Sequence, residues 1–144
     1  MTNNRPLQGR RVVVTGIGAV SPNGVGTEAF WTATRAGRSG VRRITQFDVD
    51  HLPTRIAGTV EGFDPASVMS ANDLKHVPRI VPMAVAASLE AVADSGLRPK
   101  EMPVDERRRF AVVVGSGGAG LEFIEKQFRQ YYLEDPKGVS LYTI

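Results

Sequence analysis

A glycine-rich segment is the part of this sequence whose residue types and spacing are most typical of a ligand-binding turn. Gly115-Ser-Gly117-Gly118-Ala-Gly120 fits G-x-G-x-x-G between a predicted strand and a predicted helix, where backbone N–H groups could hold a phosphate. The segment comes late in the chain, and no acidic residue ends a following strand to bind a ribose. We favour the alternative, in which the glycines allow close helix packing or leave room beside a cavity.

Cysteine and histidine are scarce in this sequence. The sequence has no cysteine, which excludes a disulfide, a thiolate metal site and a cysteine nucleophile within these residues. His51 and His76 fall in predicted turns or at a helix start, where a histidine is expected to face solvent or to bond locally. We expect no metal site and no cofactor, and neither histidine is a candidate catalytic residue.

The charge pattern gives little indication of a binding partner. The net charge is only +3, and arginines cluster at residues 10–11, 42–43 and 107–109. An acidic partner and solvated basic turns are both compatible with these clusters, and short charge runs usually face water. Aromatic residues are not interleaved with the basic ones, so we expect no nucleic acid as a partner.

The composition predicts a globular unit. The chain has 144 residues, of which 42% are apolar and 23% charged, so it is long enough to bury a core. Its longest apolar stretch, residues 80–93, is interrupted by Pro82, Ser88 and Glu90 and is shorter than a bilayer requires. The first fourteen residues lack the pattern of a secretory leader. We expect a cytoplasmic protein with no membrane segment.

Hydrophobic periodicity predicts alternating strands and helices. Strands are expected at residues 11–15, 55–60 and 109–114. Helices are expected from a Thr27 N-cap to Gly37, for two turns after Asp64-Pro65, from residues 79–81 to Gly96, and along Leu121, Ile124 and Phe128. The helix that Gly96 closes is apolar on nearly all sides, so it belongs in a domain interior. This order implies a mostly parallel or mixed sheet with helices on both faces.

Short motifs spread along the chain carry a family resemblance. They are Arg10-Arg-Val-Val-Val-Thr-Gly-Ile-Gly-Ala-Val-Ser-Pro22, Phe30-Trp31, Ala36-Gly37-Arg38-Ser39-Gly40, Ile44, Phe47-Asp48, Ile56-Ala-Gly58, Phe63-Asp64, the stretch from Ala84 to Asp94-Ser95-Gly96-Leu97, and Val114-Gly-Ser-Gly-Gly118. Each is weak alone, but their ordered run covers almost the whole chain. The sequence resembles the opening of the elongating β-ketoacyl-[acyl-carrier-protein] synthases of the thiolase-like superfamily.

The resemblance implies an α/β, thiolase-like fold, in which two βαβαβαββ halves form an α-β-α-β-α sandwich, generally in a homodimer. Residues 1–144 would hold most of the first half, and an apolar run at residues 139–144 suggests that the domain is incomplete at its C-terminus. The implied reaction is decarboxylative Claisen condensation of an acyl thioester with malonyl-[acyl-carrier-protein], in fatty-acid or polyketide synthesis. The family's cysteine and two histidines lie in later segments, so no catalytic residue is carried over and the isolated chain is predicted to be inactive.

Two other functions stay open. A non-catalytic partner subunit that keeps the fold, lacks the nucleophile and controls chain length is compatible with the same motifs. A nucleotide-binding module that uses Gly115 to Gly120 is the weaker alternative.

The resemblance also implies binding roles for three residues. Gly118 lies where some family members have an apolar side chain against a medium-to-long acyl pocket, so it would either enlarge that substrate pocket or serve only as a turn glycine. Lys75 and His76 match basic positions at the head of a helix that faces the acyl carrier protein. The third basic position is Asn72 here, and Pro82 moves the expected helix start to residues 79–81.

Overall fold

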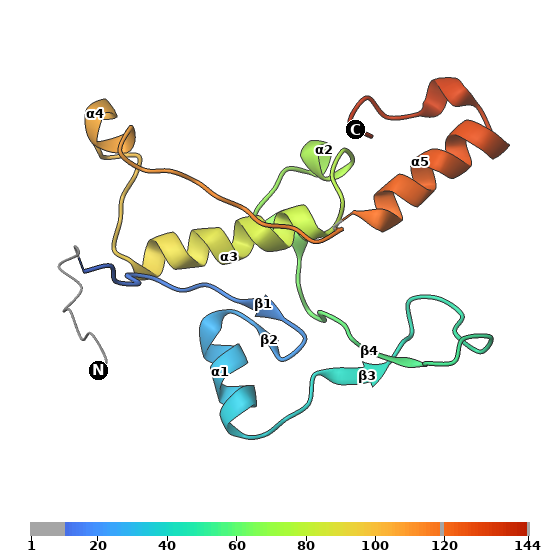
Figure 1. Cartoon of the computed structure of the whole chain (residues 1–144), viewed down its shortest axis with the longest axis horizontal. Helices are drawn as coiled ribbons and strands as arrows, with labels where there is room; N and C mark the ends of the chain where they lie inside the picture. Colours follow the sequence, from blue (N-terminus) through green and yellow to red (C-terminus); the bar gives the residue numbers. More distant parts are fainter. Residues whose placement is uncertain (1–10, 119, 144) are drawn as a thin grey trace, which may run out of the picture.

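The structure is a computed structural model, and it describes residues 11–118 and 120–143. Three residues of the motifs and runs considered above, Arg10, Ala119 and Ile144, lie outside the described part. Strands occur only before residue 59 in the described chain and all later elements are helices, of which α3 (Ile80–Asp94) runs through the middle of the arrangement (Figure 1). The other elements are placed around this helix.

Both sheets are small antiparallel hairpins. β1 (Val20–Ser21) pairs with β2 (Gly24–Val25), and β3 (Val41–Arg43) pairs with β4 (Ile56–Gly58). The strand expected at residues 55–60 is confirmed in β4. Both strand pairs are antiparallel, so parallel pairing is absent from the part of the chain that the structure describes.

The first helix, α1 (Thr27–Arg35), ends as its sequence indicates but begins differently. Gly26, with a φ of 92°, occupies the N-cap position, and Thr27 is the first helical residue, so the predicted Thr27 cap is wrong. Gly37 has a left-handed φ of 64° just after the helix. The predicted role of Gly37 is confirmed, since a helix commonly ends at a residue of this conformation.

The helix expected after Asp64 is divided into two short ones. The Asp64 carboxylate accepts a backbone N–H bond and caps a 3-10 helix (Pro65–Ser67). The Ser70 hydroxyl then accepts another backbone N–H bond and caps α2 (Ala71–Leu74). The predicted start is confirmed, but two continuous turns are not formed, because each cap begins a helix of its own.

The long helix α3 starts at Ile80, within the predicted window. This start follows from Pro82, which is tolerated in a first turn because its missing N–H would have no partner there. The Pro82 side chain is fully buried. Gly96 adopts a φ of 73° after the last turn and ends the helix as predicted.

Two further helices lie beyond the ends of α3 (Figure 1). α4 (Val104–Arg107) is a single turn beyond the C-terminal end of α3. α5 (Leu121–Leu133) projects from the N-terminal end of α3 and is followed by a 3-10 helix (Pro136–Gly138). The helix predicted from the spacing of residues 121, 124 and 128 is confirmed in α5.

Residues 11–15 and 109–114 are not strands in the structure, contrary to prediction. Their valines face solvent, with Val12 94% and Val113 91% exposed. A β-branched run becomes a strand only where a neighbouring segment completes its backbone hydrogen bonds. No segment of the described chain does so for either run, and the predicted sheet with helices on both faces is therefore not formed.

The described residues bury very few apolar side chains. Ala33 and Val49 are 6% and 3% exposed, whereas Leu89 on the apolar helix α3 is 55% exposed. The prediction that α3 lies in an interior and that the chain buries its own core is wrong for these residues. The apolar surface of α3 and of the two valine runs finds too little partner surface within the described residues.

Residues 16–19 lie directly on α3. A Cβ atom on Gly18 would overlap the carbonyl oxygen of Ala87 and would lie 2.9 Å from the Ala91 nitrogen. Gly16 is equally close to the carbonyl oxygen of Ala91. Only glycine permits this approach, because any side chain would collide with the helix backbone itself.

Two carboxylates of α3 hold the same segment in place. The Glu90 side chain accepts the Ala19 N–H at 2.9 Å and the Thr27 N–H at 2.7 Å. One turn later, Asp94 accepts the Ile17 N–H at 2.9 Å. The N–H groups of Thr27 and Ala19 lower the pKa of the Glu90 carboxyl, because they stabilise its ionised form. α3 thus binds the first hairpin and the start of α1 through side chains as well as by close packing.

Candidate functional site

The structure places Gly118 beside a shallow hollow at the head of α3. The hollow has a volume of about 390 Å³ and lies between α3, which contributes Ile80 and Met83, and the start of α5, which contributes Leu121. Arg79 and Glu122 form its polar part, and neither Lys75 nor His76 lines it. The wall around Gly118 is therefore largely apolar and suits a hydrocarbon group.

The conformation of Gly118 leaves this hollow open. Its φ is +81°, a left-handed value that side chains rarely adopt, and a Cβ placed there would meet no atom within 4 Å. Gly120 has a φ of +93° and is the N-cap of α5, with Pro78 packed against it. The left-handed φ identifies Gly118 as a turn residue, and its predicted role beside an acyl pocket stays a prediction.

Lys75 and His76 lie together at the end of α2. Lys75 is the exposed C-cap of this helix, and the half-buried His76 ring lies 4.9 Å from the Tyr142 ring, measured between centroids. The two residues therefore come before α3, which starts at Ile80, within the expected window of residues 79–81. Pro78 and Pro82 account for this start, and contact of Lys75 and His76 with a carrier protein stays a prediction.

The described residues contain no candidate metal site and no membrane-spanning helix. His51 is exposed in a turn, as expected. No cluster of three or more histidine, aspartate or glutamate residues that could hold a metal ion exists among residues 11–118 and 120–143. Within the same residues, no helix is long and apolar enough to cross a membrane.

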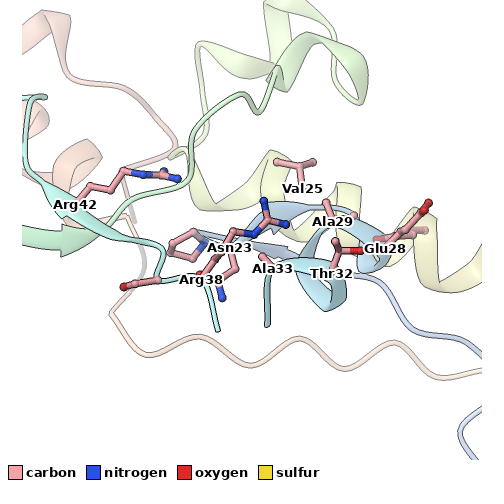
Figure 2. Close-up of a pocket in the computed structure, with 12 residues that line it drawn as sticks. Asn23, Val25, Glu28, Ala29, Thr32, Ala33, Arg38 and Arg42 are labelled. Atoms are coloured by element: carbon pink, nitrogen blue, oxygen red, sulfur yellow. The ribbon is translucent and has the colours of Figure 1, made fainter. Parts of the chain in front are cut away.

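A larger hollow of about 660 Å³ lies between α1, the β1–β2 turn and the loop before β3, as Figure 2 shows. Two of its four charged groups are engaged: Arg42 forms an ion pair with Glu61 at 2.8 Å, and both carboxylate oxygens of Glu90 accept backbone N–H bonds. Arg38 and Glu28 are exposed. We assign no reaction to this hollow, because neither hydroxyl that lines it, Thr32 or Ser39, forms a hydrogen bond with a carboxylate in the described residues.

Sequence reasoning missed Glu90 and Glu122. Glu90 interrupts an otherwise apolar stretch, and an acid on a helix that is apolar on nearly all sides should have suggested a specific backbone partner. Glu122 is exposed, yet its carboxylate accepts the Arg79 N–H at 3.1 Å. No signal in the sequence indicates that contact.

The fold defines the class of protein. A solved structure described as "The ishigamide ketosynthase/chain length factor" matches 93% of this chain with a TM-score of 0.76 and 34% sequence identity. The match covers 33% of that chain. The chain therefore has the α/β, thiolase-like fold of ketosynthases, although its two valine runs are unpaired in the described residues.

Sequence comparison identifies the family. The model of the β-ketoacyl synthase N-terminal domain matches residues 9–143. The 3-oxoacyl-[acyl-carrier-protein] synthase 2 of Vibrio cholerae is 39% identical over 94% of this chain and 32% of its own length. The tetracenomycin polyketide synthase ketoacyl synthase beta subunit of Streptomyces glaucescens is 37% identical over 91% of this chain and 31% of its own. The chain belongs to the β-ketoacyl synthase family, and it spans about a third of the length of these relatives.

The glycine-rich segment lacks the structural context of a nucleotide site. The segment lies within the matched residues 9–143, and the expected strand before it is absent. A dinucleotide fingerprint requires that strand and a parallel sheet around it. The nucleotide-binding alternative therefore has no support from the structure.

Proposed function

We propose that this chain is the N-terminal part of a synthase that condenses an acyl thioester with malonyl-[acyl-carrier-protein] in fatty-acid or polyketide synthesis. The observation that carries the proposal is the family match over residues 9–143. In the proposed reaction a cysteine thiolate attacks the acyl thioester and releases the carrier thiol. Malonyl-carrier protein then loses carbon dioxide, and its carbanion attacks the acyl-enzyme carbonyl and expels the thiolate.

The proposal assigns the reacting groups to residues outside this chain. The sequence has no cysteine, so the chain would contribute scaffold, one wall of the acyl pocket and part of the carrier-protein surface. We further propose that the complete protein is a cytoplasmic homodimer that needs no cofactor.

Purified residues 1–144 are expected to have no condensing activity. The reason is the missing nucleophile, without which no acyl-enzyme forms. The measurement is formation of the β-ketoacyl-carrier-protein product from acyl- and malonyl-carrier protein by the isolated chain, with the complete synthase as a positive control. Turnover by the isolated chain at the rate of the complete enzyme would contradict this assignment of the reacting groups.

A non-catalytic partner subunit is the second candidate function. It is favoured by the name of the Streptomyces glaucescens relative, a ketoacyl synthase beta subunit, and by the matching solved structure, which is described as a ketosynthase/chain length factor. Sequencing the gene beyond the codon for Ile144 separates the two. A cysteine soon after that residue supports the enzyme, and another residue at the nucleophile position supports the partner subunit.

Replacing Gly118 by leucine is expected to shorten the acyl chains that the complete synthase accepts. A side chain there would enter the open space beside Ile80 and Met83. One or two excluded methylene groups correspond to roughly 10- to 200-fold in kcat/KM for the longest acyl substrates. The measurement is kcat/KM for a series of acyl-carrier-protein substrates of increasing length.

Gly62 offers a matched control for the leucine variant. Its φ is +70°, and a Cβ there also meets no atom within 4 Å, but Gly62 does not line the hollow. Gly62→Leu therefore introduces the same kind of backbone strain, of roughly 1–2 kcal/mol. Equal loss for short and long substrates with Gly118→Leu would contradict the acyl-pocket role of Gly118.

Replacing Lys75 by glutamate is expected to weaken the use of carrier-protein substrates. The Lys75 ammonium is exposed, and reversing its charge would oppose an acidic partner mainly during encounter. We expect kcat/KM with acyl-carrier protein to fall about tenfold at low salt. Small thioesters without the carrier protein should be used as before.

Lys100→Glu is the control for charge reversal. Lys100 follows the C-terminal end of α3, and the 15 residues of this helix separate it from Lys75 by a helix length of roughly 22 Å. An equal loss in the Lys100 variant, or a loss with small thioesters, would rule out a specific docking role for Lys75.

A further inference from the structure

We propose that Glu122 is a positioning residue that sets the width of the acyl hollow beside Gly118. The inference rests on the proposed function, because it assigns the hollow to the acyl chain. Glu122 itself need not touch the substrate. Its carboxylate fixes the distance between the two elements that form the walls, and through that distance it determines which acyl chains fit.

The contact that carries this inference joins the heads of two helices. Glu122 is the second residue of α5, and its Oε1 accepts the backbone N–H of Arg79 at 3.1 Å. Arg79 is the N-cap of α3, and its own side chain does not cap that helix. One carboxylate therefore lies at two helix N-termini, where unpaired N–H groups and the helix dipoles both favour negative charge.

Arg79 extends the same connection to the second hairpin. Its Nη2 atom donates a hydrogen bond to the Val60 carbonyl oxygen at 2.9 Å. The Arg79 backbone is thus held from the α5 side by Glu122, and its side chain is held from the β4 side. Such two-sided bonding restrains the first turn of α3 more than either bond alone.

The two walls of the hollow move with the two partners of this bond. Ile80 directly follows Arg79, and Met83 lies one turn further along α3, while Leu121 directly precedes Glu122. Figure 1 shows that α5 meets α3 only near the head of α3 and then projects away from it. Little other packing holds the walls at a fixed separation, apart from Pro78 against Gly120. Loss of the bond should therefore let the walls separate.

The experiment compares four variants of the complete synthase: Glu122→Ala, Glu122→Gln, Glu122→Asp and Glu125→Ala. The alanine variant removes the acceptor, whereas the glutamine variant keeps an oxygen that can accept the Arg79 N–H. Glu125 is one turn further along α5, where it is exposed and pairs with Arg129. For each variant, kcat and KM are measured separately for short and long acyl-carrier-protein substrates.

We expect the ratio of kcat/KM for long and short chains to change about tenfold in Glu122→Ala, the scale of one charge-assisted hydrogen bond. The change should appear mainly in KM, and Glu122→Gln should restore most of it. Glu125→Ala should behave as the wild type. If the alanine variant does not fold, Glu122→Asp gives the test, because its shorter side chain must either draw the walls together or lose the bond.

Three results would overturn the inference. They are equal loss for all chain lengths, no difference between the glutamine and alanine variants, and the same selectivity change in Glu125→Ala. Failure of the proposed function is recognised separately. In that case the wild-type complete protein, alone or with a partner subunit, would form no condensation product from any acyl substrate.

Discussion

Replacing Gly18 by alanine is expected to destabilise the complete synthase strongly, although it adds only one carbon atom. A Cβ on residue 18 would overlap the Ala87 carbonyl oxygen and come within 2.9 Å of the Ala91 nitrogen. Both are backbone atoms of α3, so no side-chain rotation can relieve the overlap. Because overpacking a rigid site typically costs 1–3 kcal/mol and occasionally more, we expect a loss of at least about 3 kcal/mol in the free energy of unfolding.

The measurement for Gly18→Ala is the urea unfolding midpoint of the complete synthase together with its soluble yield. Gly37→Ala is the control, because Gly37 has a φ of +64° but a Cβ atom there would meet nothing within 4 Å. That variant should lose only the cost of a left-handed alanine, about 1–2 kcal/mol. If Gly18→Ala is no more destabilising than Gly37→Ala, residues 16–19 do not lie on α3 as described.

Several helix starts and helix ends could be predicted from the sequence because their causes are local. Gly37 and Gly96 end helices through their own conformational freedom. Asp64 caps a helix with an N–H only two residues away. Pro82 restricts where α3 can begin within a single turn. Each of these effects depends on only a few neighbouring residues, so the rest of the fold does not alter where the helix starts or ends.

The valine runs could not be predicted correctly from sequence alone, because a strand depends on its partner. The runs at residues 11–15 and 109–114 have strong strand propensity, yet they are exposed and unpaired. Propensity describes fitness for a pleated, half-buried surface and does not supply that surface. The same reasoning applies to α3, whose apolar faces predict burial that the described residues only partly provide.

The long-range contacts of the candidate site could not be predicted from the sequence. Gly118 lines an apolar hollow, and its role toward an acyl chain stays a prediction. Glu122, in contrast, meets a backbone N–H 43 residues away, and Glu90 meets partners 71 and 63 residues away. Neither separation leaves a periodic signal in the sequence. Both contacts involve α3. Glu90 lies on this helix and binds backbone N–H groups on either side of the hairpin of residues 20–25, and Glu122 binds the N-terminus of the helix beside the hollow.

Removal of the Glu90 carboxylate is expected to lower stability by about 2 kcal/mol, since hydrogen bonds to charged groups contribute roughly 1.5–3 kcal/mol. Glu90→Gln is the chosen variant, because an amide of similar size can accept only one of the two N–H groups and turns its own NH₂ toward the other. The measurement is urea unfolding of the complete synthase at pH 7. Glu134→Gln, at an exposed carboxylate that follows α5, is the control and should change stability little.

The pH dependence of the free energy of unfolding distinguishes the effect of the Glu90 charge from packing of its side chain. The N–H groups of Thr27 and Ala19 hold the folded-state pKa of Glu90 below the ordinary value of 4.5. A depressed folded-state pKa adds stability above the unfolded pKa, and this stability is lost as the pH falls through the folded-state value. The wild type should therefore exceed Glu90→Gln by a constant amount from neutral pH down to about pH 5, and by progressively less below pH 4.5. A difference that does not shrink in acid would mean that Glu90 acts through its shape and not through its charge.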